Sequence, residues 1–165
     1  AFFAAQEVLN CLRKDFPHLD TLSYSDYTIK DSISHGGNIA GMLSNTQLFT
    51  DSVFELVPKG GFKSEEYQKV GYPPVEGFPY PWEHETVRVI KGSDKPKILI
   101  ISDSFGGNIF PYISDSFGRS VKIFDSWQYK LNEDIVNAEK PDVVLLIVLE
   151  ANLRNMLEHQ SRLKK

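Results

Sequence analysis

The chain has 165 residues, of which 41% are hydrophobic and 24% are charged, as is ordinary for a globular domain. Its net charge of −4 is too small for an acidic tail and excludes the basic surface that nucleic-acid binding requires. The single cysteine, Cys11, excludes an intrachain disulfide and a cysteine metal site, and no apolar run approaches the length of a membrane span. We therefore expect one domain over residues 1–165, with no nucleic-acid partner.

The N-terminal part of the chain predicts helices and strands joined by polar turns. Residues 1–16 carry apolar side chains at helical spacing, which predicts an amphipathic helix. Alternating β-formers predict a short strand over 27–30, and residues 31–38 are typical of a polar turn. A helix is expected over 38–44 and a strand over 53–57.

Residues 63–86 are rich in proline and aromatic side chains, which is incompatible with a helix or a central strand. A long ordered loop of this kind is often functional. Its aromatic residues, Trp82 among them, either stack on sugar rings or pack onto the core, and the sequence does not choose between the two. An edge or hairpin strand is expected over 86–90.

The C-terminal half predicts a parallel sheet. Apolar runs suit strands that are buried on both faces, and segments with helical signals separate them. Right-handed crossovers between such strands give a three-layer α/β/α fold with a mainly parallel central sheet. The strands are expected over 97–101, 120–125 and 143–149, and the helices from the region of Pro111, from Asn132 and over 151–163.

Ser104 is the candidate nucleophile because it follows the buried strand in a tight turn before a helix. Open α/β sheets bind ligands at this edge, and a helix N-terminus stabilises an oxyanion. The alternative is that Ser104 only caps the helix. The same six letters, Ile-Ser-Asp-Ser-Phe-Gly, recur at 113–118 without a preceding apolar strand, so Ser116 is assigned to structure. Glu150 ends the last strand at the same edge as Ser104.

A serine nucleophile needs a base, and the base needs an orienting acceptor. His35 is the best candidate base, with Asp31 as its orienting partner and His84 in reserve. Asp103 is expected to brace the turn. The second oxyanion donor is either the Gly107 N–H or the Asn108 side chain. No histidine pair has metal-ligand spacing and no phosphate loop is present, so neither a metal nor a cofactor is expected.

The sequence resembles the SGNH-hydrolase-like domain of the alginate O-acetyltransferase, DHHW type. The resemblance covers about residues 20–157. It rests on the segments 97–106, 111–113 with Phe117, 140–144 and 150–153. In that family an Asp-x-His element precedes the serine in the chain, as His35 precedes Ser104. Ile33 stands where the family aspartate would be, with Asp31 four residues before His35, and Ala151 replaces a family arginine.

The resemblance implies a Ser104–His35–Asp31 triad, a covalent acyl-serine, and transfer or hydrolysis of acetyl groups on a cell-envelope polysaccharide. It also implies a bacterial, extracytoplasmic location, a membrane acyltransferase as a partner, and a position as the C-terminal part of a longer envelope protein. Because the Asp-His spacing differs, the alternatives are a bulge that lets both residues serve, a Ser–His dyad, or an inactive carbohydrate-binding or scaffold domain.

Overall fold

The computed structural model describes residues 1–36, 48–125, 132–150 and 153. The chain divides into two compact units, one formed by residues 1–22 and 63–165 and the other by residues 23–62. A single domain over 1–165 stays a prediction. The helix expected over 38–44 and, apart from Leu153, the helix expected over 151–163 lie outside the described residues.

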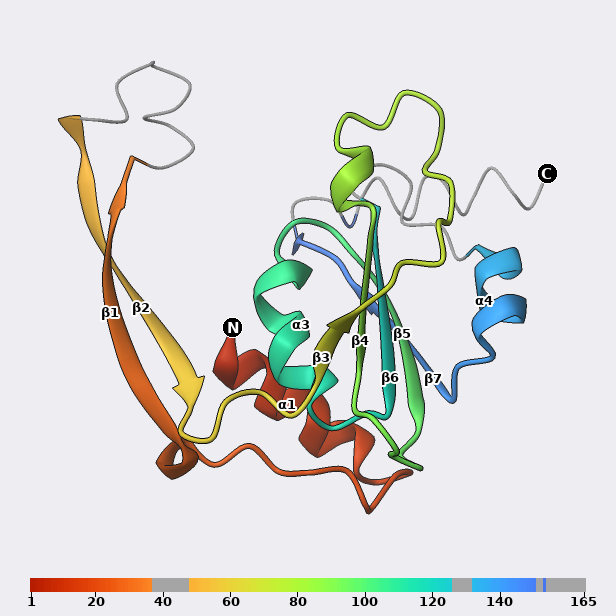
Figure 1. Cartoon of the computed structure of the whole chain (residues 1–165), viewed down its shortest axis with the longest axis horizontal. Helices are drawn as coiled ribbons and strands as arrows, with labels where there is room; N and C mark the ends of the chain where they lie inside the picture. The colour runs from red at the N-terminus through yellow and green to blue at the C-terminus, as the bar shows by residue number, and fades with distance from the viewer. Residues whose placement is uncertain (37–47, 126–131, 151–152, 154–165) are drawn as a thin grey trace. The chain divides into compact units, whose positions relative to one another are not determined.

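The larger unit is built on a five-stranded mixed sheet with the strand order β3-β4-β6-β5-β7 (Figure 1). β5 pairs in parallel with β6 and β7, whereas β4 is antiparallel to both β3 and β6. The fold class is therefore α/β as predicted, but the sheet is mixed rather than mainly parallel. The strands are β3 (Glu65–Tyr67), β4 (Glu85–Val89), β5 (Lys97–Ser102), β6 (Arg119–Phe124) and β7 (Val143–Ile147).

Among the described residues of this unit, the α-helices are α1 (Phe2–Leu12), α3 (Gly106–Ser114) and α4 (Glu133–Glu139). A 3-10 turn, η3 (Pro81–Glu83), precedes β4. α1 contacts α3, and α3 contacts β5 and β6. The side chain of Asn132 caps α4 by accepting hydrogen bonds from the first turn, as its position before two acidic residues predicted. Among the described residues, no helix combines the length and apolarity needed to cross a bilayer.

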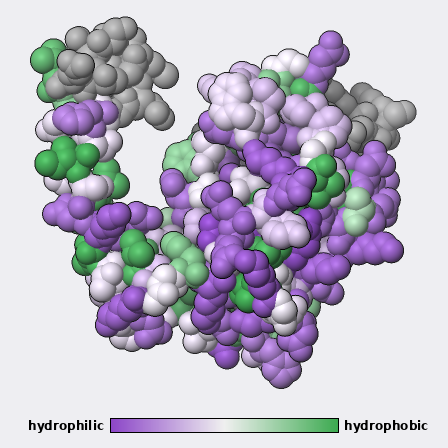
Figure 2. Space-filling model, in the orientation of Figure 1, coloured by the Kyte–Doolittle hydropathy of each residue, from purple (hydrophilic) through white to green (hydrophobic). Residues whose placement is uncertain are grey.

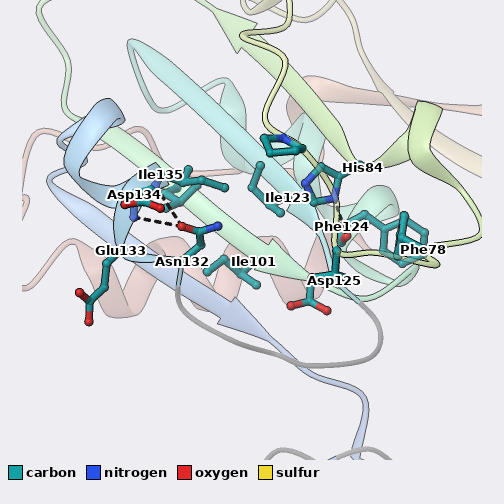
Figure 3. Close-up of a pocket in the computed structure, with 13 residues that line it drawn as sticks. Phe78, His84, Ile101, Ile123, Phe124, Asp125, Asn132, Glu133, Asp134 and Ile135 are labelled. Atoms are coloured by element: carbon teal, nitrogen blue, oxygen red, sulfur yellow. Dashed lines mark hydrogen bonds between the residues drawn. The ribbon is translucent and has the colours of Figure 1, made fainter.

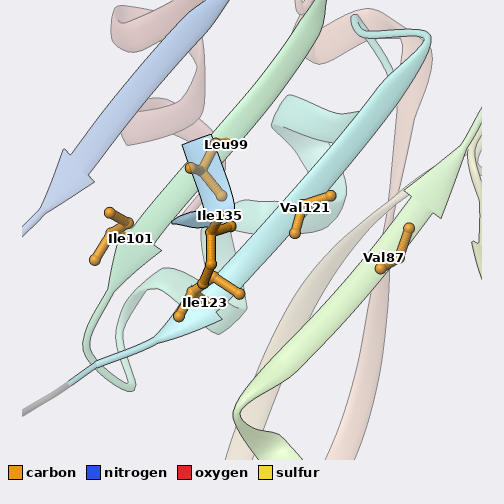
Figure 4. Close-up of a cluster of buried hydrophobic side chains, with 6 residues drawn as sticks. All are labelled: Val87, Leu99, Ile101, Val121, Ile123 and Ile135. Carbon is orange, nitrogen blue, oxygen red and sulfur yellow. The ribbon is translucent and has the colours of Figure 1, made fainter. Parts of the chain in front are cut away.

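One side of the sheet carries a cluster of buried aliphatic side chains (Figure 4). Leu99 and Ile101 alternate along β5 with Ile98 and Ile100, so the two pairs point to opposite faces of the sheet. All four are buried, which explains the unbroken apolar run in the sequence. Ile135 of α4 joins the cluster, which comprises Val87, Leu99, Ile101, Val121, Ile123 and Ile135.

Of the two alternatives for the strand expected over 86–90, the edge strand was wrong, because β4 lies between β3 and β6. β4 instead pairs antiparallel with the short β3, which precedes it in the chain, as the hairpin alternative predicted. The prediction for β7 was also wrong. β7 was expected to be buried on both faces, but it is an edge strand that ends at Ile147. Within the described residues, Val144 and Leu146 remain 43% and 38% exposed.

The smaller unit is an antiparallel hairpin of β1 (Tyr27–His35) and β2 (Thr50–Pro58), preceded by η1 (Tyr24–Asp26). The predicted polar turn at 31–38 was wrong, because β1 continues through residues 31–35 in unbroken register with β2. Figure 2 shows apolar residues on the surface of the hairpin. Ile33 is 72% exposed and Phe54 is 69% exposed. Two strands alone bury too little apolar surface to form a core.

Candidate active site

Ser104 lies in the tight turn between β5 and α3, and it is exposed. β5 ends at Ser102, and α3 begins at Gly106. The sequence therefore predicted this strand–turn–helix unit correctly. The structure gives α3 no side-chain cap, so Ser104 does not cap this helix. An exposed hydroxyl that is not used as a cap is available for chemistry.

Asp103 braces the turn, as predicted. Its carboxylate accepts a hydrogen bond from the N–H of Phe105 at 3.0 Å and another from the N–H of Leu149 at 2.8 Å. The Asp103 side chain is almost fully buried. Charge-assisted bonds of this kind are stronger than neutral ones. The residue before Ser104 thus fixes the turn and also joins it to the segment that follows β7.

Four chain segments meet at the carboxyl edge of the parallel strands. The Asp125 N–H, just after β6, donates to the Ser102 carbonyl at 2.7 Å, and the Leu149 contact brings the segment after β7 to the Ser104 turn. Glu150 is the next residue and is exposed. β4 runs antiparallel to β6, so the aromatic segment before it also arrives at this edge. Ligands of open α/β sheets bind at this edge.

The two predicted oxyanion donors differ in what they contact. The Gly107 N–H is directed at the Ser104 carbonyl at 3.3 Å, which is a long hydrogen bond. Asn108 is exposed on the first turn of α3.

A Cβ on Gly106 would lie 2.1 Å from the Ser102 hydroxyl oxygen, so only glycine lets the helix start this close to β5.

Lys122 is a charged neighbour that sequence reasoning missed. It lies half-buried on β6, and its ammonium is 5.9 Å from the centre of the Phe110 ring. A Cβ on Gly107 would be 3.7 Å from its Nζ atom. Burial lowers the pKa of Lys122. The signal in the sequence was a lysine between the apolar residues Val121 and Ile123 of a strand.

The segment 63–86 packs some of its rings on the core and exposes others, and stacking of the exposed rings on sugars stays a prediction. Phe78 is buried and makes an edge contact with Phe124 at 5.3 Å between ring centres. Trp82 remains 64% exposed and meets the half-exposed Tyr80 edge-on at 6.0 Å. The Phe124 N–H donates to the carbonyl of His84 at 2.7 Å, which ties this segment to the end of β6.

The candidate base and its partner lie in the other unit. Asp31 and His35 are exposed residues of β1, on the same face of the strand. Residues four apart in a strand are separated by roughly 13 Å, so Asp31 does not reach His35 while β1 is regular. The paired register leaves no bulge in β1 to bring them together. Their approach to Ser104 stays a prediction.

The second copy of the Ile-Ser-Asp-Ser-Phe-Gly motif, at 113–118, has different surroundings from the first. Ser116 is fully buried, and Asp115 accepts bonds from the backbone of Lys63 and from both the N–H and hydroxyl of Ser64. This agrees with the structural role assigned to Ser116.

No group of three or more metal-ligating side chains is found in the part of the chain that the structure describes.

Comparison with known proteins identifies relatives by structure alone. No family model matches the sequence, and no curated protein matches it. Two structures of Bacillus cereus PatB1 share the fold, with TM-scores of 0.66 and 0.63 at 17% and 15% identity. The first carries a sulfonyl adduct. A DHHW family protein from Eubacterium siraeum matches with a TM-score of 0.58 at 14% identity. The matches cover 89–92% of this chain but only 54–59% of the other chains, so this chain spans little more than half of their length.

Proposed function

We propose that the chain is a serine-dependent acyl-transfer domain, an O-acetyltransferase or acetylesterase that acts on a cell-envelope polysaccharide. The observation that carries the proposal is the exposed Ser104 in a braced turn at the ligand-binding edge of the sheet. The resemblance of the sequence to a DHHW-type family and the shared fold with a DHHW family protein support it. The proposal includes the three-layer SGNH-like arrangement and an extracytoplasmic location, with a membrane acyltransferase as the partner that delivers acyl groups.

The proposed reaction has two halves. The Ser104 oxygen bonds to the acyl carbon, and its proton passes to the imidazole of His35 with Asp31 as orienting partner. The bond from the acyl carbon to the leaving oxygen then breaks, and the imidazolium returns the proton to that oxygen. In the second half the oxygen of a sugar hydroxyl or water bonds to the acyl carbon, and its proton passes to the His35 imidazole. The bond from the acyl carbon to the Ser104 oxygen then breaks, and the imidazolium returns the proton to that oxygen.

The remaining residues have proposed roles in holding the substrate. The Ser104 N–H and the Asn108 side chain stabilise the oxyanion, and Asn108 is preferred to Gly107 because the Gly107 N–H already faces a carbonyl. Trp82 and Glu150 contact the sugar from opposite ends of the same sheet edge.

Covalent labelling tests the nucleophile. Sulfonyl fluorides label activated serines, and PatB1 itself is recorded with a sulfonyl adduct. We expect phenylmethylsulfonyl fluoride to add one sulfonyl group to the wild-type chain, at Ser104 by peptide mass spectrometry, and not to label Ser104→Ala. Ser116→Ala is the matched control, because it removes the hydroxyl of the same motif at a buried position. Labelling elsewhere in the wild type would refute the proposal.

Hydrolysis of p-nitrophenyl acetate tests the base. His35→Ala is expected to lower the Ser104-dependent rate by about 100-fold or more, as for loss of a general base. His84→Leu puts an apolar side chain at this buried position and removes the imidazole, and it is expected to retain that rate. If His35→Ala has the wild-type rate, the base is not His35, although Ser104 remains the nucleophile as long as it is labelled.

A carbohydrate-binding domain without catalysis is the second candidate. The exposed Tyr80–Trp82 pair favours it, because exposed rings stack on sugars without needing a base. It predicts equal, negligible hydrolysis by the wild type and Ser104→Ala, together with glycan retention that is lost in Trp82→Ala.

A further inference from the structure

The larger unit contains a cavity of about 480 Å³ beside the carboxyl-terminal halves of β5 and β6 (Figure 3). The start of α4 and the segment 73–84 complete its walls. The size is within the usual range for small-molecule sites, about 300–1,000 Å³. The walls combine apolar and polar side chains, and Ile101, Ile123, Ile135, Phe78 and Phe124 are among the apolar ones.

His84 lines this cavity and has a buried ring nitrogen without a partner among the described residues. The side chain is only 7% exposed, and its Nδ1 lies 3.2 Å from the Phe124 carbonyl oxygen. A carbonyl only accepts, so Nδ1 carries the ring proton and donates it. Nε2 is then the lone-pair acceptor of the neutral imidazole. Among the described residues this buried atom has no hydrogen-bond partner. A buried acceptor of this kind calls for a donor from a ligand or solvent.

The cavity wall that α4 forms offers a donor. The Oδ1 atom of Asn132 accepts from the N–H groups of Asp134 and Ile135 at 3.0 and 3.3 Å, and its amide nitrogen points toward the cavity (Figure 3). An amide nitrogen only donates. Three acidic side chains also line the cavity, namely Asp125, Glu133 and Asp134. Their charge disfavours an anionic ligand.

We propose that this cavity binds a small, uncharged alcohol or phenol with an apolar body. A hydroxyl group both donates and accepts, so it matches a site that offers an acceptor, His84 Nε2, and a donor, the Asn132 amide. The apolar body packs against Ile101, Ile123 and the edge of Phe78. The site uses neither Ser104 nor His35, so it goes beyond the acyl-transfer function and does not depend on it.

Ligand titration of the whole chain tests the chemistry. We expect p-cresol to bind saturably, as followed by calorimetry. Toluene lacks the hydroxyl, and 4-methylbenzoate replaces it with a carboxylate, so each is expected to bind at least about tenfold more weakly, the effect of losing one good hydrogen bond. Equal affinity for toluene would overturn the proposal, because the cavity would then be only apolar. Failure of p-cresol to bind would overturn it as well.

Two further measurements locate the site. His84→Leu removes the acceptor and is expected to weaken p-cresol binding at least about tenfold, whereas the exposed His18→Gln leaves it unchanged. In the wild type, the nitrogen NMR signal of His84 Nε2 is expected to shift on addition of p-cresol while the His18 signals do not. This second readout decides the question even if His84→Leu fails to fold. An unmoved His84 signal at saturating p-cresol would place binding elsewhere and refute the site.

Discussion

The close approach of α3 to β5 makes a sharp prediction for Gly106. A Cβ at this position would lie 2.1 Å from the hydroxyl oxygen and 2.3 Å from the Cβ of Ser102. Ser102 is fully buried, so its side chain has no room to move aside. Gly106→Ala must therefore push the start of α3 away from the strand and displace Ser104, which is two residues earlier.

The expected magnitude is the difference between two opposing effects. Overpacking a buried contact costs typically about 1–3 kcal/mol. Alanine returns up to about 1 kcal/mol through its better helix propensity. Because the overlap involves the Ser102 Cβ as well as its hydroxyl, we take the cost at its upper end and expect a net loss of about 2 kcal/mol in the free energy of unfolding. Urea denaturation followed by circular dichroism measures this loss.

Gly107→Ala is the matched control, because it adds the same methyl group one residue later. Its Cβ would meet only the flexible end of Lys122, at an ordinary 3.7 Å. We expect its stability to be unchanged or raised by about 0.5 kcal/mol. Sulfonyl labelling of Ser104 should fall in Gly106→Ala and persist in Gly107→Ala. Ser102→Ala should not rescue Gly106→Ala because it keeps the Cβ, whereas Ser102→Gly should restore part of the labelling. Wild-type stability in Gly106→Ala would show that the reasoning about the contact is wrong.

Three further predictions concern charged groups. Asp103→Ala should lower the free energy of unfolding by about 2–3 kcal/mol, because it leaves two backbone N–H groups without their carboxylate. The same variant should slow sulfonyl labelling of Ser104, and an unaltered labelling rate would show that Asp103 does not position the turn. The bidentate contact with Arg119 lowers the pKa of Glu139 below the ordinary glutamate value of 4.5. The contact therefore stabilises the fold fully at pH values above 4.5, and this contribution is lost as the pH falls through the lowered pKa. Glu139→Gln should therefore cost about 2 kcal/mol at pH 7 and little at pH 3, by urea denaturation at each pH; equal losses at the two pH values would contradict this. The Lys122 ammonium lies near Gly107, where it can support the developing oxyanion. Lys122→Met should therefore slow sulfonyl labelling of Ser104 by about tenfold, and Lys122→Arg should slow it less. Equal labelling rates in the two variants would show that the charge of Lys122 has no part in the site.

The fold of the larger unit could be predicted where apolar runs and turn signals agree. The run at 98–101 and the polar residues after it predicted β5 and its turn correctly, and Asn132 marked the start of α4. These signals are local, because each depends on side chains within a few residues of the element. The antiparallel half of the sheet was missed, since β3 has only three residues and lies in a segment whose prolines indicated a loop.

The hairpin shows why the candidate base was harder to predict than the nucleophile. Polar residues over 31–35 are typical of a turn, yet they form a strand because each of them lies opposite a residue of β2 in unbroken antiparallel register. The pairing is a non-local interaction, so the residues themselves give little sign of it. The cavity and the unpartnered nitrogen of His84 were also invisible, because they depend on how four separate segments pack.

The two copies of the Ser-Asp-Ser-Phe-Gly motif have the same residues at different places in the fold, so comparing them shows what the place contributes. In both copies the aspartate accepts from a distant backbone N–H, that of Leu149 for Asp103 and that of Ser64 for Asp115. The serine that follows is exposed in the first copy and fully buried in the second. The aspartate therefore does the same physical work in both, which is to hold a backbone turn. What differs is the preceding element, a buried parallel strand in one copy and the end of a helix in the other. Only the strand delivers its serine to a sheet edge where other segments converge, so the reactivity proposed for Ser104 follows from that edge and not from the motif.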